Sequence, residues 1–429
     1  MSTNNEVNFL KLSLHGRLVG YLAGYRSGKN SLIFSKEFQQ DSHRPTFSLI
    51  THPSFPKSQT LISKSWEQNH RLHPSLSNLL PEGALRELIA QALKVHVDNE
   101  FQILSYLGED LPGALVASAL APDDVPDNIL SEHRSAKVIK FDDAFYERRA
   151  RVNKFSLAGV QMKFSMKAND GRYNLSKEGA LGDWIIKTPS TQHRDVPLNE
   201  FTAMTLASIA GVDVPEMRLV ELDKLDNLPS IKLPDEKYAF AIKRFDRNSE
   251  SKQDQRIHME DFAQVLVKHP SQKYEAANYE NIAKVLYQYS GDRLADVQQC
   301  AKRLLVNILL ANGDAHLKNW SLLYSDRVTP RLSPAYDIVT TSAYIEGENE
   351  FALNLNKGKN WYMVNFSHFE AWARKADISW HVIKLQLEDV MNKARTLWPS
   401  EIQGLPMNDD HKTLLRKHWV NLHPDFRIN

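Results

Sequence analysis

The chain has little of several features that mark particular classes of protein. Its 429 residues include a single cysteine, Cys300, which excludes an internal disulfide framework and a zinc site made of several thiolates. The formal net charge is only +1, so no whole-protein field favours nucleic acid, membranes or acidic substrates. Because a single cysteine cannot form an internal disulfide, we expect the protein to lie in a reducing compartment, the cytoplasm.

Long hydrophobic runs are also missing. No uninterrupted apolar stretch approaches the ~20 residues that a membrane-spanning helix needs. The first residues, MSTNNEVNFL, do not place a basic segment before an apolar one, so we expect an unprocessed, soluble chain with no membrane association. With 42% apolar residues, the chain can bury a large core and is expected to form two or three lobes.

Local patterns divide the chain into three parts, 1–150, 151–250 and 251–429. Short β-branched and aromatic runs between Gly, Ser and Asn predict a small sheet in residues 9–50. Residues 121–150, rich in Asp and Pro, are typical of a surface connection, and we place a boundary there. In the last part the apolar residues recur mainly at helical spacing. The expected fold class is α+β.

A glycine-containing segment near the N-terminus resembles a phosphate-binding P-loop at first sight. Between Gly24 and Gly28 it is one residue short, and Asn30 stands where a Ser or Thr would contact magnesium. We therefore interpret it as a hairpin turn.

The segment Leu310–Asp337 carries the most suggestive polar residues. An apolar helical run stops at Gly313, which suits the left-handed residue that ends a helix. Asp314 and Asn319 follow on a loop, and a predicted two-strand hairpin then returns the chain to Asp337. Two carboxylates and an amide brought together can hold a magnesium–phosphate group and orient a hydroxyl.

A phosphate-binding counterpart is predicted in the second part of the chain. Backbone N–H groups at the bend of Ala158 and Gly159 can cradle phosphate oxygens, although such a bend alone is more often an ordinary turn. Lys187 ends a short apolar run and suits a point-charge contact with phosphates. Glu200 lies on the inward face of a predicted helix, where pairing with Lys187 and stabilisation by the helix dipole are equally weighted alternatives.

Taken together, these residues predict phosphoryl transfer. Lys187, Asp314, Asn319 and Asp337 follow one another in the order used by protein kinases, and the Asp-x4-Asn spacing is that of the kinase catalytic loop. In a kinase, the backbone of the linker that follows a strand such as the run ending at Lys243 contacts the adenine. Here the backbone from Lys243 to Phe245 would make these contacts. A metal-dependent phosphohydrolase is disfavoured, because we find no dense carboxylate or histidine cluster.

The sequence resembles the HipA-like serine/threonine toxin kinases of bacterial type II toxin–antitoxin systems. The motifs that carry the resemblance are, in chain order, Leu79–Gly83, Gly108–Gly113, Ser156–Lys163, Ile185–Lys187, Asn199-Glu200, Arg244–Arg247, Gly313–Asn319 and Pro334–Asp337. The resemblance implies a two-lobed protein-kinase-like fold, with an α/β N-terminal lobe that includes an extra subdomain and a mainly helical C-terminal lobe. It makes Asp314 the catalytic aspartate, Asn319 and Asp337 the magnesium (Mg2+) ligands, and Lys187 the phosphate-binding lysine.

The resemblance also implies a phosphate-binding loop for ATP. Its expected contacts are Ser156, Leu157, Ala158, Gly159, Val160, Gln161 and Lys163. Ser156 matches the serine that family members autophosphorylate, which expels the loop and silences the kinase. Val160 stands where Ala is usual and Met162 where Glu is usual, so any contact of that acid is lost. Because the cradle is backbone, we expect nucleotide binding to survive.

Partners and targets are likewise implied by the resemblance. Family members phosphorylate a serine on a cytosolic protein, with an aminoacyl-tRNA synthetase the known kind of target, and a small helix-turn-helix antitoxin neutralises them. We expect operator DNA to be bound mainly through that antitoxin, since a basic face near Lys412, Arg416 and Lys417 is better explained as a solvated helix face. The polar loop at residues 188–196 is where we expect substrate contacts. The alternative function is a catalytically silent, nucleotide-binding co-repressor.

Overall fold

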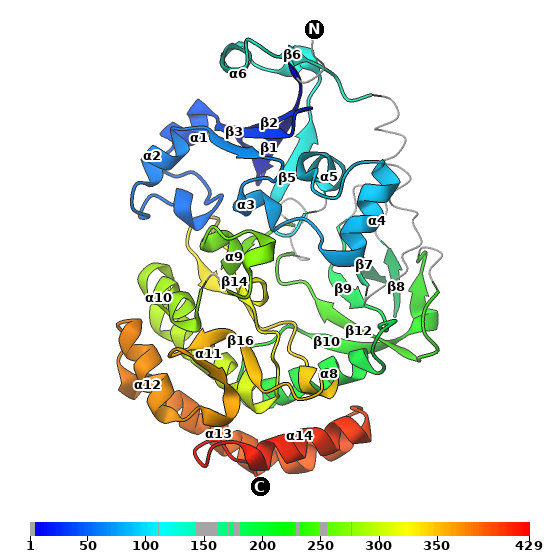
Figure 1. Cartoon of the computed structure of the whole chain (residues 1–429), viewed down its shortest axis with the longest axis vertical. Helices are drawn as coiled ribbons and strands as arrows, with labels where there is room; N and C mark the ends of the chain where they lie inside the picture. Colours follow the sequence, from blue (N-terminus) through cyan, green and yellow to red (C-terminus); the bar gives the residue numbers. More distant parts are fainter. Residues whose placement is uncertain are drawn as a thin grey trace.

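A computed structural model describes residues 5–109, 111–142, 162–169, 171–175, 181–228, 232–248, 255–275 and 277–429. The predicted phosphate-loop residues Ser156 to Gln161 lie outside this part of the chain. Figure 1 shows an N-terminal domain above a sheet lobe on the right and a helical lobe on the left, with α13 and α14 along the lower edge.

The predicted small sheet near the N-terminus is present. Its strands are β1 (Glu6–Leu14), β2 (Arg17–Tyr25), β3 (Lys29–Phe34), β4 (Trp66–Asn69), β5 (Leu115–Ala119) and β6 (Lys137–Val138). They are ordered β4-β3-β2-β1-β5, and β6 pairs in parallel with β1. The expected hairpin turn joins β2 to β3, and Gly28 adopts a φ of 91° there, a conformation that favours glycine.

Six helices accompany this sheet in the part of the chain described. They are α1 (Lys36–Gln40), α2 (Ser58–Ile62), α3 (Pro74–Ser77), α4 (Gly83–Leu93), α5 (Glu100–Leu107) and α6 (Asp127–Glu132). Buried Phe101 and Leu104 of α5 join the core under the sheet. Residues 121–142 do more than connect domains, because Val125 and Ile129 are buried against β1 side chains and β6 extends the sheet.

The second lobe is built on another antiparallel-rich sheet. Its strands are β7 (Lys163–Asn169), β8 (Arg172–Leu175), β9 (Trp184–Lys187), β10 (Met217–Glu221), β11 (Leu225–Asp226) and β12 (Tyr238–Lys243), in the order β10-β12-β9-β7-β8-β11. The helix α8 (Val196–Ile209) packs on β10 and β12 through an apolar face that includes Ala203, Met204 and Ala207. Gly211 follows this helix with a φ of 88°, a conformation that favours glycine.

The last part of the chain is mainly helical, as expected. Its helices are α9 (Phe262–Val265), α10 (Tyr279–Tyr289), α11 (Arg293–Leu309), α12 (Phe366–Lys375), α13 (Trp380–Gly404) and α14 (Asp409–Asn421). Its strands are β13 (His258–Asp261), β14 (Ser321–Tyr324), β15 (Arg331–Leu332), β16 (Glu350–Leu355) and β17 (Gly358–Asn360). The apolar stripe of α11 is buried between α10 and α13, and β14 pairs with β15 as the predicted hairpin.

The prediction for Gly313 is wrong. The helix α11 already ends at Leu309, and Ala311 rather than Gly313 adopts the left-handed conformation, with a φ of 50°. Gly313 saves space instead, because a Cβ atom there would lie only 3.0 Å from the backbone carbonyl oxygen of Glu350 and would push aside the Glu348 side chain. The glycine therefore lets residues 348–350 approach the loop that carries Asp314.

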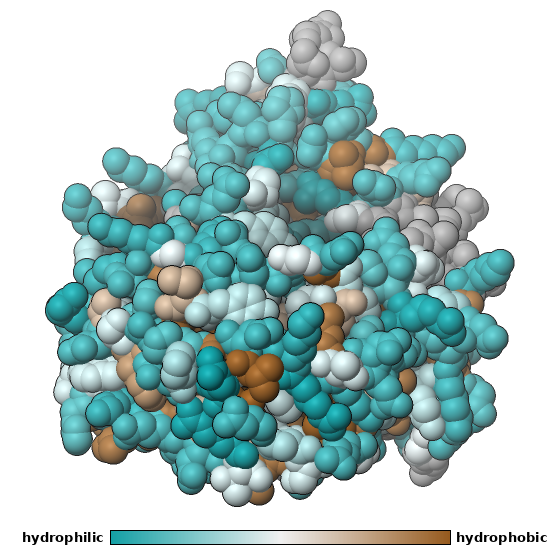
Figure 2. Space-filling model, turned by 60° about the horizontal axis from the view of Figure 1, so that its bottom comes forward, coloured by the Kyte–Doolittle hydropathy of each residue, from teal (hydrophilic) through white to brown (hydrophobic). Residues whose placement is uncertain are grey.

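None of the described helices is both long and apolar enough to cross a bilayer. On the face seen in Figure 2, hydrophilic residues predominate and the apolar ones form only small separate spots. Scattered apolar side chains of this kind are normal on a folded protein.

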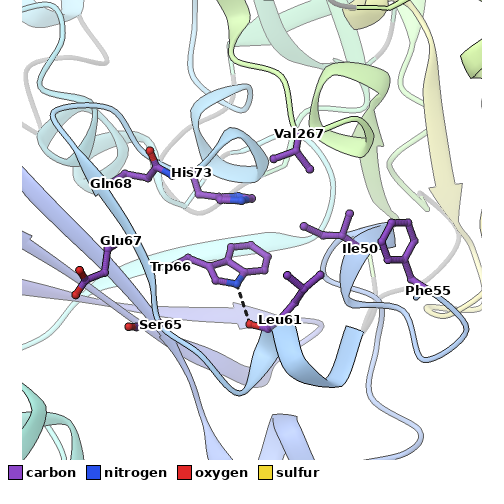
Figure 3. A pocket seen from close by; sticks show the side chains of 9 residues that line it. All are labelled: Ile50, Phe55, Leu61, Ser65, Trp66, Glu67, Gln68, His73 and Val267. Carbon is purple, nitrogen blue, oxygen red and sulfur yellow. Dashed lines mark hydrogen bonds between the residues drawn. The ribbon is translucent and has the colours of Figure 1, made fainter. Parts of the chain in front are cut away.

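A largely apolar groove lies where the N-terminal domain meets α9. Figure 3 shows Trp66 between Leu61 and His73, with Val267 facing them from the helical lobe. The Trp66 and His73 rings lie 4.1 Å apart, and the indole N–H donates to the Leu61 carbonyl over 2.9 Å. The cavity volume is about 480 Å³, and none of the predicted site residues lines it.

A buried carboxylate, Glu260 of β13, fastens the N-terminal domain to the helical lobe. It accepts hydrogen bonds from the Ser48 hydroxyl over 2.8 Å and the Leu49 backbone N–H over 2.7 Å. The Tyr324 hydroxyl donates to the same carboxylate from β14. Burial raises the pKa of Glu260 to about 7, although these hydrogen bonds oppose the rise. The interface therefore contains a group that titrates near neutral pH.

We predict that Glu260→Gln removes a pH dependence of stability. Because the folded pKa lies above the unfolded value of 4.5, the folded state holds an extra proton between pH 4.5 and about 7. Wild-type stability should fall by about 2–3 kcal/mol across that range as pH rises. The isosteric amide can keep the three hydrogen bonds, so the variant should be the more stable protein at pH 8. Urea unfolding at pH 5 and pH 8 measures the difference.

The control for this experiment is Glu401→Gln, which changes an exposed glutamate of α13. Its stability should follow wild type at both pH values. If Glu260→Gln shows the same loss of stability between pH 5 and pH 8 as wild type, the role assigned to Glu260 is wrong.

Candidate active site

Lys187 ends β9 and is buried between two carboxylates. Its ammonium forms ion pairs with Glu200 of α8 and with Asp337 of the helical lobe. Glu200 is itself fully buried, so the structure decides between the two alternatives for this residue in favour of the ion pair. A buried charge without such a partner would cost several kcal/mol. The pairing therefore links the sheet lobe to the helical lobe at one point.

A second lysine reaches the same carboxylate. Lys163 of β7 lies directly opposite Lys187 of β9 in the antiparallel register, so both side chains project from the same face of the sheet. The Lys163 ammonium lies 3.0 Å from Oδ2 of Asp337. Asp337 itself adopts a left-handed backbone conformation, with a φ of 54°. Two cations thus converge on one carboxylate in a constrained loop.

The electrostatics of this cluster favour the charged forms of Lys187 and Asp337. Burial alone would lower the pKa of Lys187, but the Asp337 and Glu200 carboxylates raise it above its usual range. Burial would likewise raise the pKa of Asp337, but the Lys163 and Lys187 ammonium groups hold it far below its usual range. Lys187 and Asp337 are therefore both charged at neutral pH.

Asp314 is fixed through its backbone rather than by packing of its side chain. Its N–H donates to the side chain of Asn312 over 3.1 Å, and its carbonyl accepts from the Asn319 amide over 2.7 Å. The preceding N–H, of Gly313, donates to the Thr341 hydroxyl over 2.7 Å. The Asp314 carboxylate is half exposed and lies at the surface of the site.

Arg303, which the sequence analysis missed, connects the two predicted metal ligands. Its guanidinium is buried in α11 and donates to the backbone carbonyls of Asn319 and Tyr336, the neighbour of Asp337. It also stacks 4.5 Å from the Trp320 ring centroid. Burial lowers its pKa to about 10, so it stays charged at neutral pH. The available signal was a charged residue within the otherwise apolar stripe of the helix.

The N-terminal domain also contacts the loop that carries Asp314 and Asn319. Glu82, in the turn after Leu79, forms ion pairs with Lys318 at 2.5 Å and with Lys273 at 2.8 Å. The Lys318 ammonium also donates to the carbonyl of Asn78 over 3.0 Å. Burial opposes ionisation of Glu82, but chiefly Lys318 lowers its pKa to about 2. The Leu79–Gly83 motif thus holds the residue that precedes Asn319.

Part of the backbone that is predicted to contact adenine is already hydrogen-bonded within the protein. The N–H of Lys243 donates to the Glu216 carbonyl and that of Arg244 to the Asp183 carbonyl, each over 2.8 Å. The Phe245 ring lies 5.5 Å from the Tyr336 ring, which places this segment beside the predicted metal-binding loop. Since these two N–H groups are engaged, the predicted adenine contacts are reduced to the Lys243 carbonyl and the backbone of Phe245.

The donor set suits magnesium better than a transition metal. The described residues contain no group of three or more His, Cys, Asp or Glu side chains that could enclose an ion. Magnesium at nucleotide sites instead takes one or two protein oxygens together with phosphates. The Asp337 carboxylate and the Asn319 side-chain oxygen fit that need. His316 is buried, its pKa is lowered to about 4 mainly by burial, and it belongs to no such cluster.

Two models of known protein families match this chain. The HipA-like C-terminal domain matches residues 155–398 and the HipA N-terminal domain matches residues 10–118. The chain belongs to the HipA-like kinase family. Lys163, Lys187, Asp314, Asn319 and Asp337 all fall within the first of these matches.

Relatives of this HipA-like kinase cover nearly its whole length. It is 39% identical to the Sinorhizobium fredii protein named "Putative kinase Y4dM", over 94% of each chain. It is 25% identical to "Serine/threonine-protein kinase toxin HipA" of Shewanella oneidensis, over 83% of this chain and 80% of that protein. These relatives, with the family matches, identify the chain as a kinase.

A solved structure confirms the expected two-lobed fold. HipA of Shewanella oneidensis, in a complex with HipB and its operator DNA, superimposes with a TM-score of 0.70 at 20% sequence identity. The match covers 96% of this chain and 95% of that one. The N-terminal domain and both lobes therefore share the HipA fold.

We predict that Lys187→Met destabilises the kinase by about 3 kcal/mol, because it leaves the buried Glu200 carboxylate without its cation. Urea unfolding measures the loss. Adding Glu200→Gln to the variant should restore part of it, since the unpaired charge is then removed. Lys167→Met, on an exposed position of β7, is the matched control and should stay within ~0.5 kcal/mol of wild type. Equal stability of the two lysine variants would contradict this assignment.

Proposed function

We propose that this HipA-like kinase transfers the γ-phosphate of ATP to serine or threonine hydroxyls in a magnesium-dependent reaction. The observation that carries the proposal is the ion pair of Lys187 with Asp337, which joins a cation of the sheet lobe to a carboxylate of the helical lobe. Arg303 supports the same arrangement by tying the Asn319 backbone to that of Tyr336.

Each requirement of phosphoryl transfer has a residue that can meet it. Lys187 and Lys163, which face Asp337, would contact the nucleotide phosphates as point charges. Asp337 and Asn319 would hold magnesium, which when bound neutralises charge on the phosphates. The half-exposed carboxylate of Asp314 would orient the attacking hydroxyl and accept its proton.

A regulatory modification belongs to the same proposal. Ser156, by resemblance to the family, would be autophosphorylated, which would expel the phosphate loop of residues 156–161 and stop the kinase. Lys163 follows that loop in the chain and already faces Asp337. A change in the loop would therefore act close to the carboxylates that pair with Lys187.

The biological role that we propose is that of a toxin in a toxin–antitoxin pair. The Shewanella oneidensis relative is named a kinase toxin, and its solved complex contains HipB and operator DNA. By analogy, a helix-turn-helix antitoxin would neutralise this cytoplasmic kinase and carry most of the DNA contact. Lys412 is engaged with Asp409 at 3.2 Å, which reduces the charge that this part of α14 could offer to DNA. An aminoacyl-tRNA synthetase remains the proposed class of target.

We predict that Asp314→Asn lowers phosphate transfer from γ-labelled ATP by about 10²–10⁴-fold, because it removes the group that accepts the hydroxyl proton. Transfer to proteins of a cell lysate and to the kinase itself is followed by gel autoradiography and intact mass. Asp377→Asn is the control: this exposed aspartate follows α12 in a left-handed conformation, which Asn tolerates.

Two outcomes of this experiment bear on separate parts of the proposal. Equal labelling by wild type and Asp314→Asn would rule out the kinase mechanism and favour the silent co-repressor. Peptide mapping of the self-labelled protein should place the phosphate on Ser156. If the label lies elsewhere, the proposed autophosphorylation site is wrong although the kinase activity stands.

A further inference from the structure

One side chain outside the predicted site touches the proposed catalytic carboxylate. Tyr274 follows the short helical turn Pro270–Gln272, and its hydroxyl donates a hydrogen bond to Oδ1 of Asp314 over 2.7 Å. Tyr274 is 40% exposed and the Asp314 side chain is 51% exposed, so the contact lies at the surface of the site. No step of the proposed mechanism uses this tyrosine.

The contact has the geometry that an acceptor hydroxyl would need. In phosphoryl transfer the catalytic aspartate accepts a hydrogen bond from the attacking hydroxyl. The acceptor oxygen then forms a bond to the γ-phosphorus, the bond to ADP breaks, and the proton passes to the aspartate. A hydroxyl group of Tyr274 already fills one such position on Asp314.

The backbone of Asp314 does not depend on Tyr274 for its position. Its backbone is held on both sides, by Asn312 at its N–H and by Asn319 at its carbonyl. The hydrogen bond from Tyr274 is therefore not needed to hold the backbone of this residue and acts on its carboxylate alone. The tyrosine is better explained as a group that competes for the carboxylate.

The segment that carries Tyr274 is anchored while its ring stays accessible. The carbonyl of Lys273 accepts from the N–H of Leu317 in the catalytic loop over 3.3 Å. The Lys273 ammonium pairs with Glu82 of the N-terminal domain at 2.8 Å. The His316 ring meets the Tyr274 ring edge-on, with centroids 5.0 Å apart. A rotation of the exposed side chain can free Asp314 without moving this backbone.

We propose that Tyr274 gates the acceptor site: its hydroxyl occupies the place on Asp314 that the substrate hydroxyl must take. The proposal rests on the kinase mechanism given above and adds a determinant of acceptor binding. An acceptor must displace Tyr274 before transfer. Substrate segments with neighbouring groups that can bind the rotated tyrosine are therefore favoured over an isolated hydroxyl. The link through Lys273 to Glu82 places this gate under the control of the N-terminal domain.

The test compares Tyr274→Phe with wild type, because phenylalanine keeps the ring and loses only the hydroxyl. The acceptor probe is a synthetic peptide with the sequence of residues 151–166, which contains Ser156, and ATP hydrolysis serves as a second probe with water as the acceptor. We expect KM for the peptide to fall about tenfold, as for the loss of a competing hydrogen bond to a charged group. The values of kcat for the peptide and KM for ATP should stay within twofold, and ATP hydrolysis should rise.

The matched control is Tyr287→Phe, on a half-buried tyrosine of α10, which should leave all these constants unchanged. A lower kcat with unchanged KM in Tyr274→Phe would show that the tyrosine positions Asp314, and would overturn the gate. Phosphate found on Tyr274 of the wild type would overturn it too, by making the tyrosine an acceptor. Constants equal to wild type would refute the gate alone, whereas absence of transfer by wild type and variant would refute the kinase mechanism on which it rests.

Discussion

The buried ion pair of Lys187 with Asp337 and Glu200 is the interaction on which the site depends. Three separate elements contribute to it, β9, α8 and the loop after β15, so the lobes must be docked for the charges to be satisfied. Since an unpaired charge at this depth is costly, the cluster fixes the relative position of the lobes. The same ammonium and carboxylate groups are those that a nucleotide and its metal would engage. Structural and chemical demands therefore meet in one cluster.

The N-terminal domain is integrated with the kinase lobes. Glu260 of the helical lobe accepts hydrogen bonds from Ser48 and Leu49, and Glu82 of the N-terminal domain binds Lys318 beside Asn319. The first contact is distant from the predicted chemistry, and the second reaches the predicted catalytic loop. Any partner that shifts the N-terminal domain would thus also act on residues 314–319. This coupling gives a physical route by which the domain could regulate the site.

The sequence predicted helices and strands better than the long-range contacts of individual residues. Periodic apolar residues identified α8 and α11, and the hairpin β14–β15 followed from its strand-like runs, because these patterns are local. Glu200 stayed undecided between two roles, since only burial against Lys187 distinguishes them. Glu82, Arg303 and Tyr274 were given no role in the site because their partners lie far along the chain. Gly313 was misjudged for the same reason: the backbone that approaches it closely is that of Glu350.

Magnesium-dependent nucleotide binding at Asp337 is the central claim. The most direct test is calorimetric titration of a non-hydrolysable ATP analogue, with magnesium or with EDTA, into wild type and Asp337→Asn. Magnesium should tighten binding to wild type by at least about tenfold and should have almost no effect on Asp337→Asn, because the variant lacks the carboxylate that would hold the metal. An equal magnesium effect in both proteins would contradict the account.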